Sequence, residues 1–541
     1  MIALNSGNQG NRKDLVEGNK IPDEAIDHIW DNMLTEQERN AVEKIWSLID
    51  TLFPMLDNVN RKLMGMPLKK VEGHYFPIKH ERKLSLFAAR NEDVQNAKDA
   101  FVGPAYMAYP RAGHRDKRTG AVLPLRLDIG VIASHLEETI HDITHSIPVT
   151  EAYRVIIDPK VAKAITDIAG EQMYEQLVPW LKNISRPMRE ARSVVESLSL
   201  RMRKGTTAAF LGLKATTTAL QMLAGTQTID EIGYAPVMKA VTKFAGNPVE
   251  MVKAINEKSV MMRYRGRMFD REIAQFHRTM ASKKVTRVME KVSACYFTPI
   301  IVLDMAVAYP SWLAAYEKGF KDFQGDENKA VDYADSVVRR TQSAAGPKDL
   351  ASIQRGNELK KWVTMFYTFF SVFQNRMMEL NRKADMQGML KPETLYMYFR
   401  SYMLQIAIPA VLSFMLYNWR LPEGKEWFTE LLYYRLTGIP IIRDIANPAL
   451  NGWDYEFSPA AGGYAAFAKT FKDFGKTIEA WIEEDEIPWS RLGRDIVWTA
   501  GYWYGLPSAQ MLITMDGIVD LWEDKTDNPF RLFFREPREA E

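Results

Sequence analysis

The apolar residues near the start of the chain recur with the spacing of an amphipathic helix. Thr35 and Glu38 stand at the spacing of a capping box, in which two side chains cap each other's backbone amides. The apolar residues that follow keep the helical period: Ile45, Leu48, Ile49, Leu52, Met55 and Leu56. This pattern predicts a helix that begins after Thr35 and kinks at Pro54.

The helical period returns beyond residue 124 and dominates the rest of the chain. It is clear in residues 127–147 and 161–184, whereas no alternation typical of a strand is sustained. Between residues 65 and 124, prolines, glycines and clustered basic residues break the period and indicate loops. We therefore expect an all-α protein, an irregular, elongated multi-helix array with a loop-rich insert near residues 65–124.

These patterns divide the chain into five segments, and no repeat of fixed period joins them. The expected segments are an N-terminal amphipathic helical segment (1–64), the loop-rich insert (65–124), a helical domain (125–295), an apolar and aromatic helical region (296–420) and a C-terminal helical region (421–541).

Five apolar stretches stand out from the helical background: residues 206–224, 296–315, 362–373, 402–419 and 494–515. None is a clean membrane span. The third is too short, and Lys214, Asp304, Gln405 and Asp495 would each place a polar group in or beside a bilayer. Each stretch alone fits a buried core helix or membrane contact. Together they favour a protein that is soluble in one state and inserts in another.

Residues 362–419 are the stretch most suited to conditional membrane binding. The 18 residues from Tyr402 to Trp419 would span about 27 Å as a helix, with a kink expected at Pro409. Aromatic and basic residues stand where interfacial anchors belong: Trp362, Tyr417, Trp419, Lys360, Lys361 and Arg420. In residues 206–224, the face formed by Gly212, Thr216, Ala219 and Leu220 is mostly small and permits close helix approach.

Composition adds limits to this picture. Of the 541 residues, 70 are Lys or Arg and 68 are Asp or Glu, so the strong positive field of a general nucleic-acid binder is missing. The single cysteine, Cys295, excludes an intrachain disulfide and a multi-cysteine metal site. Residues 1–20 hold no apolar run behind a basic flank, so no secretory signal is expected.

Candidate chemistry is sparse. His141 and His145 share one helical face, with Glu137 and Glu138 a turn earlier, but the spacing gives no third metal ligand and no HExxH order. A phosphate-binding loop and a GxSxG motif are both missing, and Cys295 has no histidine nearby in sequence. We therefore predict no catalytic residue, no cofactor and no metal.

Two basic runs offer local surfaces for phosphates or headgroups. The first holds Arg186, Arg189, Arg192, Arg201, Arg203 and Lys204, and the second holds Arg263, Arg265, Arg267 and residues 283–287. Both are interrupted by acidic residues, so a solvated helix face explains them equally. DNA contact through these local helices remains open at this point.

Residues 331–382 are the most distinctive stretch. A helix ending in Arg339 and Arg340 meets a Gly346–Pro347 break, and a polar segment then leads into an aromatic helix. A helix–loop–helix corner is the structural interpretation of this pattern. The functional interpretation assigns interaction roles to Arg339, Arg340, Gln342, Gln354, Arg355, Trp362 and Trp419.

Several segments, in order along the chain, resemble the helical segments of the large polyvalent proteins of phages and conjugative elements. They are ALNSGNQGNRKDLVEG, HYFPIKHE, DIGVIASHLEETIHDITHSIPVTEAYRVIIDPKV, ADSVVRRTQ with KDLASIQRG and KWVTMFYTFFSVFQN, GIPIIRDIANP and YGLPSAQ. That family includes virion-packaged proteins delivered with DNA. The resemblance implies a helical protein that enters the host with DNA, often as a module of a longer polypeptide.

Three functions follow as hypotheses. The first is a virion internal or ejection-type protein, carried in the virion interior and released into the host envelope or cytoplasm, where it contacts or crosses the membrane. The second is a soluble module that protects incoming DNA from host defences. The third, a metal-dependent enzyme around His141 and His145, requires bound zinc. Expected partners are other virion proteins or a longer polyprotein, the host membrane, DNA, and further copies of the chain in a homo-oligomer.

Overall fold

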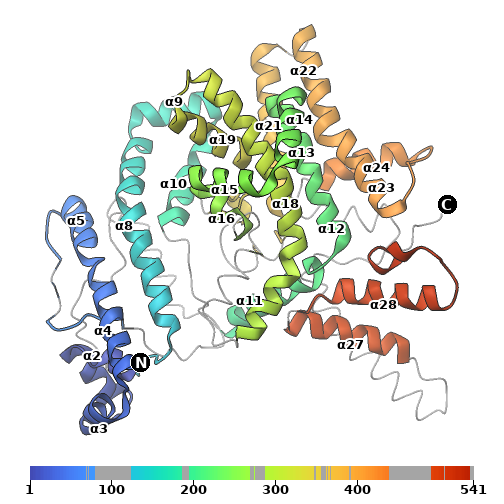
Figure 1. Ribbon diagram of the computed structural model, residues 1–541. Coiled ribbons are helices and arrows are strands. Elements are labelled where there is room, and N and C mark those ends of the chain that lie inside the picture. Colours follow the sequence, from blue (N-terminus) through green and yellow to red (C-terminus); the bar gives the residue numbers. More distant parts are fainter. Residues whose placement is uncertain are drawn as a thin grey trace. The chain divides into compact units, whose positions relative to one another are not determined.

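The computed structural model describes residues 1–68, 70, 72–78, 124–185, 194–267, 273, 287–346, 349–354, 361, 364–365, 367–388, 391–437, 489–504 and 506–535. All regular elements in these ranges are helices and none is a strand, which confirms the all-α prediction (Figure 1). Most of the expected loop-rich insert, residues 79–123, lies outside the described residues.

The chain forms two compact units. Unit 1 comprises Met1–Ser197 with Ala281–Lys284, and unit 2 comprises Leu198–Met280 with Val285–Glu541. The division therefore falls inside the segment 125–295, which the sequence patterns present as one helical domain.

Unit 1 is built from short N-terminal helices followed by longer ones. Its elements are α1 (Ile2–Asn5), α2 (Gln9–Lys13), η1 (Asp14–Gly18), α3 (Asp23–His28), η2 (Ile29–Met33), α4 (Glu36–Asp50), α5 (Phe53–Met64), α8 (Gly130–Ile156), α9 (Pro159–Ala169) and α10 (Glu171–Ser185). The capping box predicted at Thr35 and Glu38 is present, and the hydrogen bond from the Thr35 backbone lowers the pKa of Glu38. At Pro54 the chain starts a new helix, α5, instead of kinking one long helix, because proline fits the first turn best.

The glycine- and asparagine-rich N-terminus packs against the HYFP segment. Asn8 donates to the carbonyl of His74 over 3.0 Å, and Asn11 donates to the carbonyl of Phe76 over 3.0 Å. The ring of Trp46 stacks on His74 with centroids 4.3 Å apart. Two of the segments that carry the family resemblance thus form one local structure in unit 1.

Gly7 is one of the tightest points of this structure. A Cβ atom at Gly7 would lie 2.6 Å from the Trp46 ring and 2.9 Å from His74 Cβ. We expect Gly7→Ala to lower the free energy of unfolding of unit 1 by about 1–3 kcal/mol, the usual cost of overpacking. Gly10→Ala is the matched control, since its Cβ would meet only the Asn8 side chain at 3.4 Å. Urea unfolding followed by Trp fluorescence measures both; equal stability of the two variants would contradict the assignment.

Unit 2 contains the remaining helices. They are α12 (Ala215–Leu220), η4 (Gln221–Leu223), α13 (Ala224–Ile232), α14 (Tyr234–Gly246), α15 (Pro248–Lys258), α16 (Val260–Tyr264), η5 (Arg265–Arg267), α18 (Arg287–Asp322), α19 (Glu327–Thr341), η6 (Ser352–Gln354), α21 (Tyr367–Gln387), α22 (Pro392–Tyr402), η7 (Met403–Ala407), α23 (Ile408–Asn418), α24 (Glu426–Thr437), α27 (Trp489–Tyr504), α28 (Ser508–Trp522) and η8 (Pro529–Leu532). Helix α11 (Val194–Leu211) runs across the boundary between the units.

The main core of unit 2 lies around α18. Tyr309 and Trp312 of α18 are almost fully buried and pack with Val337 and Val338 of α19 and with Met262 of α16. Earlier in α18, Asp304 accepts two hydrogen bonds of 2.8 Å from the guanidinium of Arg265, and both side chains are buried. The apolar stretch 296–315 is therefore largely the core helix of this unit.

Candidate functional site: an apolar stripe above buried polar contacts

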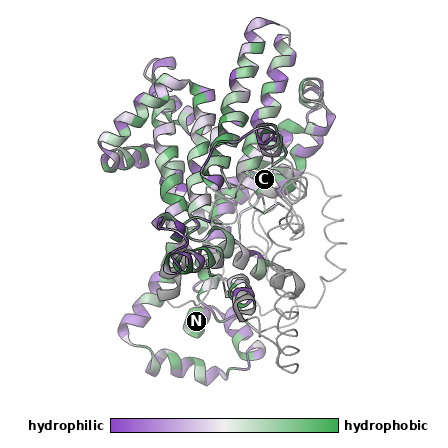
Figure 2. Cartoon of the chain, turned by 90° about the vertical axis from the view of Figure 1, so that its right-hand side faces the viewer, coloured by the Kyte–Doolittle hydropathy of each residue, from purple (hydrophilic) through white to green (hydrophobic). Residues whose placement is uncertain are grey.

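The most unusual surface of unit 2 lies on the continuous helix made of α22, η7 and α23. From Met403 to Trp419, every exposed residue is apolar or aromatic. Together with three exposed residues of α22 they form what we call the outer stripe: Leu395, Tyr396, Phe399, Met403, Ile408, Leu412, Met415, Tyr417 and Trp419. Hydrophobic side chains thus reach the surface here instead of being confined to the core. Figure 2 colours each residue by hydropathy and shows hydrophobic and hydrophilic positions mixed along most helices of the chain.

The opposite, inner face of the same helix carries three buried polar residues. Thr394, Ser401 and Gln405 are buried, beside the apolar Ile406 and Ala410. Ile406 and Ala410 pack in a cluster with Phe373 of α21 and Tyr434 of α24, and burial raises the pKa of Tyr434. In a helix on the surface of a soluble protein the polar residues normally face water. Here Thr394, Ser401 and Gln405 face the protein; Glu393 and Arg400 of α22 are exposed, and from Met403 on the exposed side is apolar.

A π-helical turn lies in the middle of this helix. Residues Met403–Ala407 form η7, between the α-helical segments α22 and α23. Outer-stripe residues are spaced by four from Leu395 to Phe399 and from Phe399 to Met403 and then by five to Ile408, so the step of five falls on η7. A π-turn holds more residues than an α-turn, and such turns are frequent at functional sites. This turn lies directly before Pro409, where the sequence predicts a kink, and Pro409 stands in the first turn of α23.

Asp230 of α13 accepts hydrogen bonds from several residues of α22 and η7. Ser401 Oγ donates to its carboxylate over 2.8 Å, Gln405 Nε2 over 2.6 Å and Arg400 over 3.2 Å. Arg376 of α21 adds a fourth contact of 3.2 Å. The Asp230 side chain is only 4% exposed. Three of its four side-chain partners therefore come from one short segment of the helix that carries the outer stripe.

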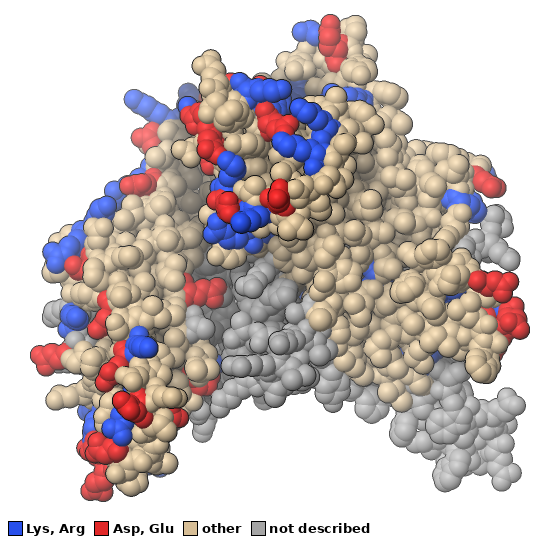
Figure 3. Space-filling view, in the orientation of Figure 1, with Lys and Arg blue, Asp and Glu red and all other residues tan. Residues whose placement is uncertain are grey.

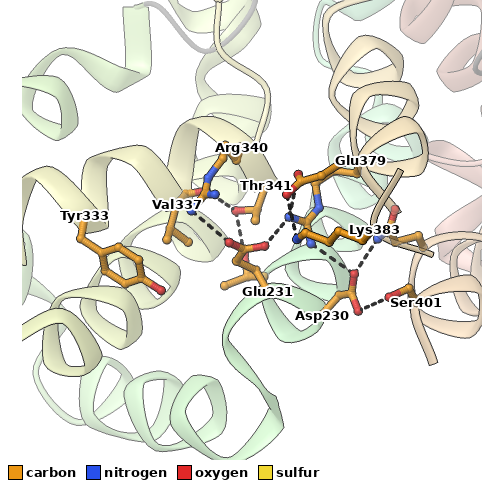
Figure 4. A network of polar contacts seen from close by, with 12 residues as sticks. Asp230, Glu231, Tyr333, Val337, Arg340, Thr341, Glu379, Lys383 and Ser401 are labelled. Carbon is orange, nitrogen blue, oxygen red and sulfur yellow. Dashed lines mark hydrogen bonds and ion pairs between the residues drawn. The ribbon is translucent and has the colours of Figure 1, made fainter. Parts of the chain in front are cut away.

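Glu231 extends this cluster to α19. It pairs with Arg376 and, over 3.0 Å, with Arg340 (Figure 4). Burial opposes the charge on Arg376, but the charge and hydrogen bond of Glu231 together with the charges of Asp230 and Glu379 outweigh it, so the pKa of Arg376 is raised. We call Asp230, Glu231, Arg340, Arg376, Arg400, Ser401 and Gln405 the Asp230 network; it joins α13, α19, α21 and the α22–η7 segment.

A second apolar strip lies on α28. Its exposed residues are Met511, Met515, Ile518, Val519 and Trp522, while Ser508 and Gln510 are buried. At the end of α23, Trp419 packs against Phe530 and Phe534, with ring centroids 6.1 and 5.4 Å apart. Figure 3 shows few charged side chains on the face of unit 2 over α12 and α28. A second helix of this unit thus exposes a strip of apolar residues, beside the surface pair of Asp516 with Arg494.

Two described helices are long and apolar enough to cross a membrane, Cys295–Asp322 and Pro392–Asn418. In the first, 56% of the most apolar window is buried, and in the second 39%. Length and composition also fit core helices of soluble proteins, so burial is the useful distinction. It assigns the first helix to the core and leaves the second as the candidate for lipid contact.

The other apolar stretches are interrupted. Residues 206–224 turn at Leu213, whose φ is +57°, and a Cβ atom at Gly212 would lie 2.8 Å from Pro507 Cβ. The small face predicted at Gly212 does permit close approach, although the stretch is not one helix. Residues 494–515 are divided between α27 and α28, and the start of 362–373 lies outside the described residues.

The proposed interaction residues divide between the interior and the surface. Gln342 donates to Thr228 Oγ1 over 3.0 Å, Gln354 donates to Thr368 Oγ1 over 3.4 Å, and both amides are buried. Arg340 belongs to the Asp230 network, and Arg339 is half-buried in the last turn of α19. Trp419 is 45% exposed. Arg355, Trp362 and Lys360 lie outside the described residues.

Several expected charged contacts are made within the chain. Arg420, predicted to meet headgroups, forms a bidentate pair with Glu426 at 2.6 and 2.7 Å. In the basic runs, Arg203 is buried and Arg265 binds Asp304. Arg263 is exposed and donates to the backbone carbonyl of Asn256. Arg186, Arg189, Arg192, Lys283 and Lys284 lie outside the described residues.

His141 and His145, the candidate zinc ligands, stack on one another with ring centroids 4.2 Å apart. His141 Nε2 lies 2.8 Å from the carbonyl oxygen of Ile184, so this nitrogen is the donor. Among the described residues, no group of three or more His, Cys, Asp or Glu side chains is placed to hold a metal ion.

Of the residues around Asp230, the sequence patterns single out Gln405 but not Asp230, Arg376, Arg400 or Ser401.

Comparison with protein-family models, with curated proteins and with solved structures finds no match to the chain.

Proposed function

We propose that unit 2 binds lipid bilayers through the outer stripe, and that the chain acts as an ejection-type protein during delivery of DNA into a host cell. The observation that carries the membrane part is the helix Pro392–Asn418, which buries Thr394, Ser401 and Gln405 and whose exposed residues are all apolar or aromatic from Met403 on. The delivery part rests on the resemblance to phage and conjugative-element polyvalent proteins.

The physical case concerns the exposed area. A row of nine apolar and aromatic side chains along one helix is costly in water, and such contiguous patches mark contact sites. Lipid is the occupant that matches it best, because the row contains no exposed charge from Met403 to Trp419 and ends in Tyr417 and Trp419. Aromatic rings of this kind prefer the interface between water and hydrocarbon.

Charged residues flank the row at both ends. Lys391 precedes α22 and Lys425 follows α23, and both are exposed, as are Glu393 and Glu423 near them; Arg400 adds an exposed cation within α22. Lysines at such positions attract anionic headgroups, each contributing on the order of 1 kcal/mol near an anionic surface. We therefore expect binding that is stronger on anionic vesicles and weaker at high salt.

The double variant Ile408→Lys, Leu412→Lys tests this proposal. Both side chains are about two-fifths exposed, so the fold tolerates lysine there, while two charges enter the outer stripe. We expect the partition coefficient onto anionic liposomes to fall roughly tenfold or more, since lysine in the hydrocarbon region is strongly disfavoured. Flotation of the purified chain at low and high salt measures this.

Met238→Lys, Val241→Lys on α14 is the matched control, because these residues are exposed to the same degree, 39% and 38%. It should float like the unchanged chain. If the unchanged chain stays in the soluble fraction under all conditions, the membrane proposal is wrong and the soluble module that protects incoming DNA replaces it. Mass spectrometry of purified particles tests the delivery part separately; it requires the chain to be present in virions.

A further inference from the structure

The Asp230 network holds the helix of the outer stripe to the rest of unit 2 by its polar side. Asp230 accepts hydrogen bonds from Ser401 and Gln405, and Arg400 reaches both its carboxylate and its backbone carbonyl, the latter over 3.0 Å. All three donors lie within residues 400–405, one and a half turns of the helix. Elsewhere the helix is held by apolar contacts with α21 and α24, by a hydrogen bond of 3.1 Å from Tyr398 to Asn381, and at its end by Trp419 against Phe530 and Phe534.

On the proposed membrane function, these polar contacts would limit how deeply the helix enters a bilayer. While they are intact, only the outer stripe is available, and the helix can lie no deeper than the headgroup boundary. Pro392–Asn418 has 27 residues, which span about 40 Å as a helix and exceed a hydrocarbon layer of about 30 Å. Length therefore permits a transmembrane state, and the bonds to Asp230 oppose it.

Leaving the docked position has a specific cost. Asp230 and Arg376 are buried, and Asp230 would lose three of its four side-chain partners. Ser401 and Gln405 would lose the acceptor of their hydrogen bonds as well, because lipid offers no comparable acceptor. Removing the charge of Asp230 weakens the docked state without altering the helix itself.

We propose that the Asp230 network is a latch that keeps the helix Pro392–Asn418 in a surface-bound state and that its opening permits transmembrane insertion. This inference rests on the proposed membrane function and adds its regulation. The latch belongs to the protein side of the helix, whereas the outer stripe mediates the first contact, so the two can be tested separately.

The decisive variant is Asp230→Asn, which keeps the shape of the side chain and removes its charge. Bound to anionic liposomes, the unchanged chain should be released by alkaline carbonate. The variant should stay in the bilayer, with the resistant fraction rising roughly tenfold or more. A fluorophore at Ser413→Cys in a Cys295→Ser background should move from shallow to deep, as measured with quenchers placed at different bilayer depths.

Asp304→Asn is the matched control. It removes another buried carboxylate of unit 2 that is held by an arginine, but Asp304 does not contact the helix Pro392–Asn418 through this pair. Ser401→Ala is the milder variant, since it removes one donor and leaves Asp230 bonded to the others. We expect Asp304→Asn to behave like the unchanged chain and Ser401→Ala to give an intermediate resistant fraction.

The outcomes separate the two proposals. If the unchanged chain floats and Asp230→Asn is released by carbonate to the same extent, the latch is refuted and the membrane function stands. If Asp304→Asn becomes resistant as well, general loosening of unit 2 explains insertion, and the latch is again refuted. If neither the unchanged chain nor Asp230→Asn floats, both proposals are wrong. Resistance of Asp230→Asn and Ser401→Ala alone supports the latch.

Discussion

Replacing Arg265 with alanine is expected to lower the free energy of unfolding of unit 2 by about 3–5 kcal/mol, the usual cost of removing one partner of a buried ion pair. Arg265 and Asp304 are each 3% exposed and are joined by two hydrogen bonds of 2.8 Å. Without the guanidinium, the carboxylate of Asp304 would remain among the residues of α18 with neither water nor a counter-charge.

Urea unfolding followed by circular dichroism measures this loss. Arg494→Ala is the control, because Arg494 forms a comparable pair with Asp516 at an exposed position; exposed pairs contribute about 0–1 kcal/mol. The combined variant Arg265→Met, Asp304→Leu should recover most of the stability, since it removes both charges together. A single Arg265→Ala variant as stable as Arg494→Ala would show that the pair is not buried in solution.

Trp312→Ala is expected to have a similarly large effect, about 3–5 kcal/mol on the same unfolding transition. Trp312 is 1% exposed, its ring stacks on Tyr316 with centroids 5.0 Å apart, and its Nε1 donates to Asp335 over 2.7 Å. Alanine would leave a cavity between α18 and α19 and would remove a donor from a carboxylate.

Trp312→Phe separates these two effects, because it retains most of the ring and loses only the donor. Asp335 would still accept from Ser259 over 2.7 Å, so we expect phenylalanine to cost clearly less than alanine. Trp522→Ala, at a side chain that is 86% exposed, should change stability by less than about 0.5 kcal/mol. Equal losses for Trp312→Ala and Trp522→Ala would place Trp312 at the surface.

Local signals in the sequence predicted much of the fold. The capping box at Thr35 depends on residues three apart, and the helical period of residues 127–147 depends on residues three and four apart, so neither needs tertiary information. The break at Pro54 was predicted as a kink. The first turn of a helix tolerates proline as readily as a kink does, and the sequence does not distinguish the two.

The candidate site was less predictable, because its parts come from distant segments. Residues 402–419 are conspicuous for their apolar composition, but which of their faces is exposed depends on α13, α21 and α24. Asp230 and Gln405 are separated by 175 positions in the sequence. No local pattern links them. Gln342 and Gln354 illustrate the opposite error: polar residues in a distinctive motif suggest external contacts, while these two amides bond within the chain.

The π-helical turn Met403–Ala407 changes the angle between successive side chains in the middle of the helix. In a regular α-helix each residue advances by about 100°, so a helical wheel drawn for residues 392–418 would rotate Ile408, Leu412 and Met415 away from Leu395, Phe399 and Met403. The widened turn absorbs one residue and brings the two halves closer to alignment. A change in length at this turn would therefore alter the surface more than most substitutions. Losing one residue would rotate every side chain beyond it about the helix axis, while the composition of the helix stayed almost unchanged.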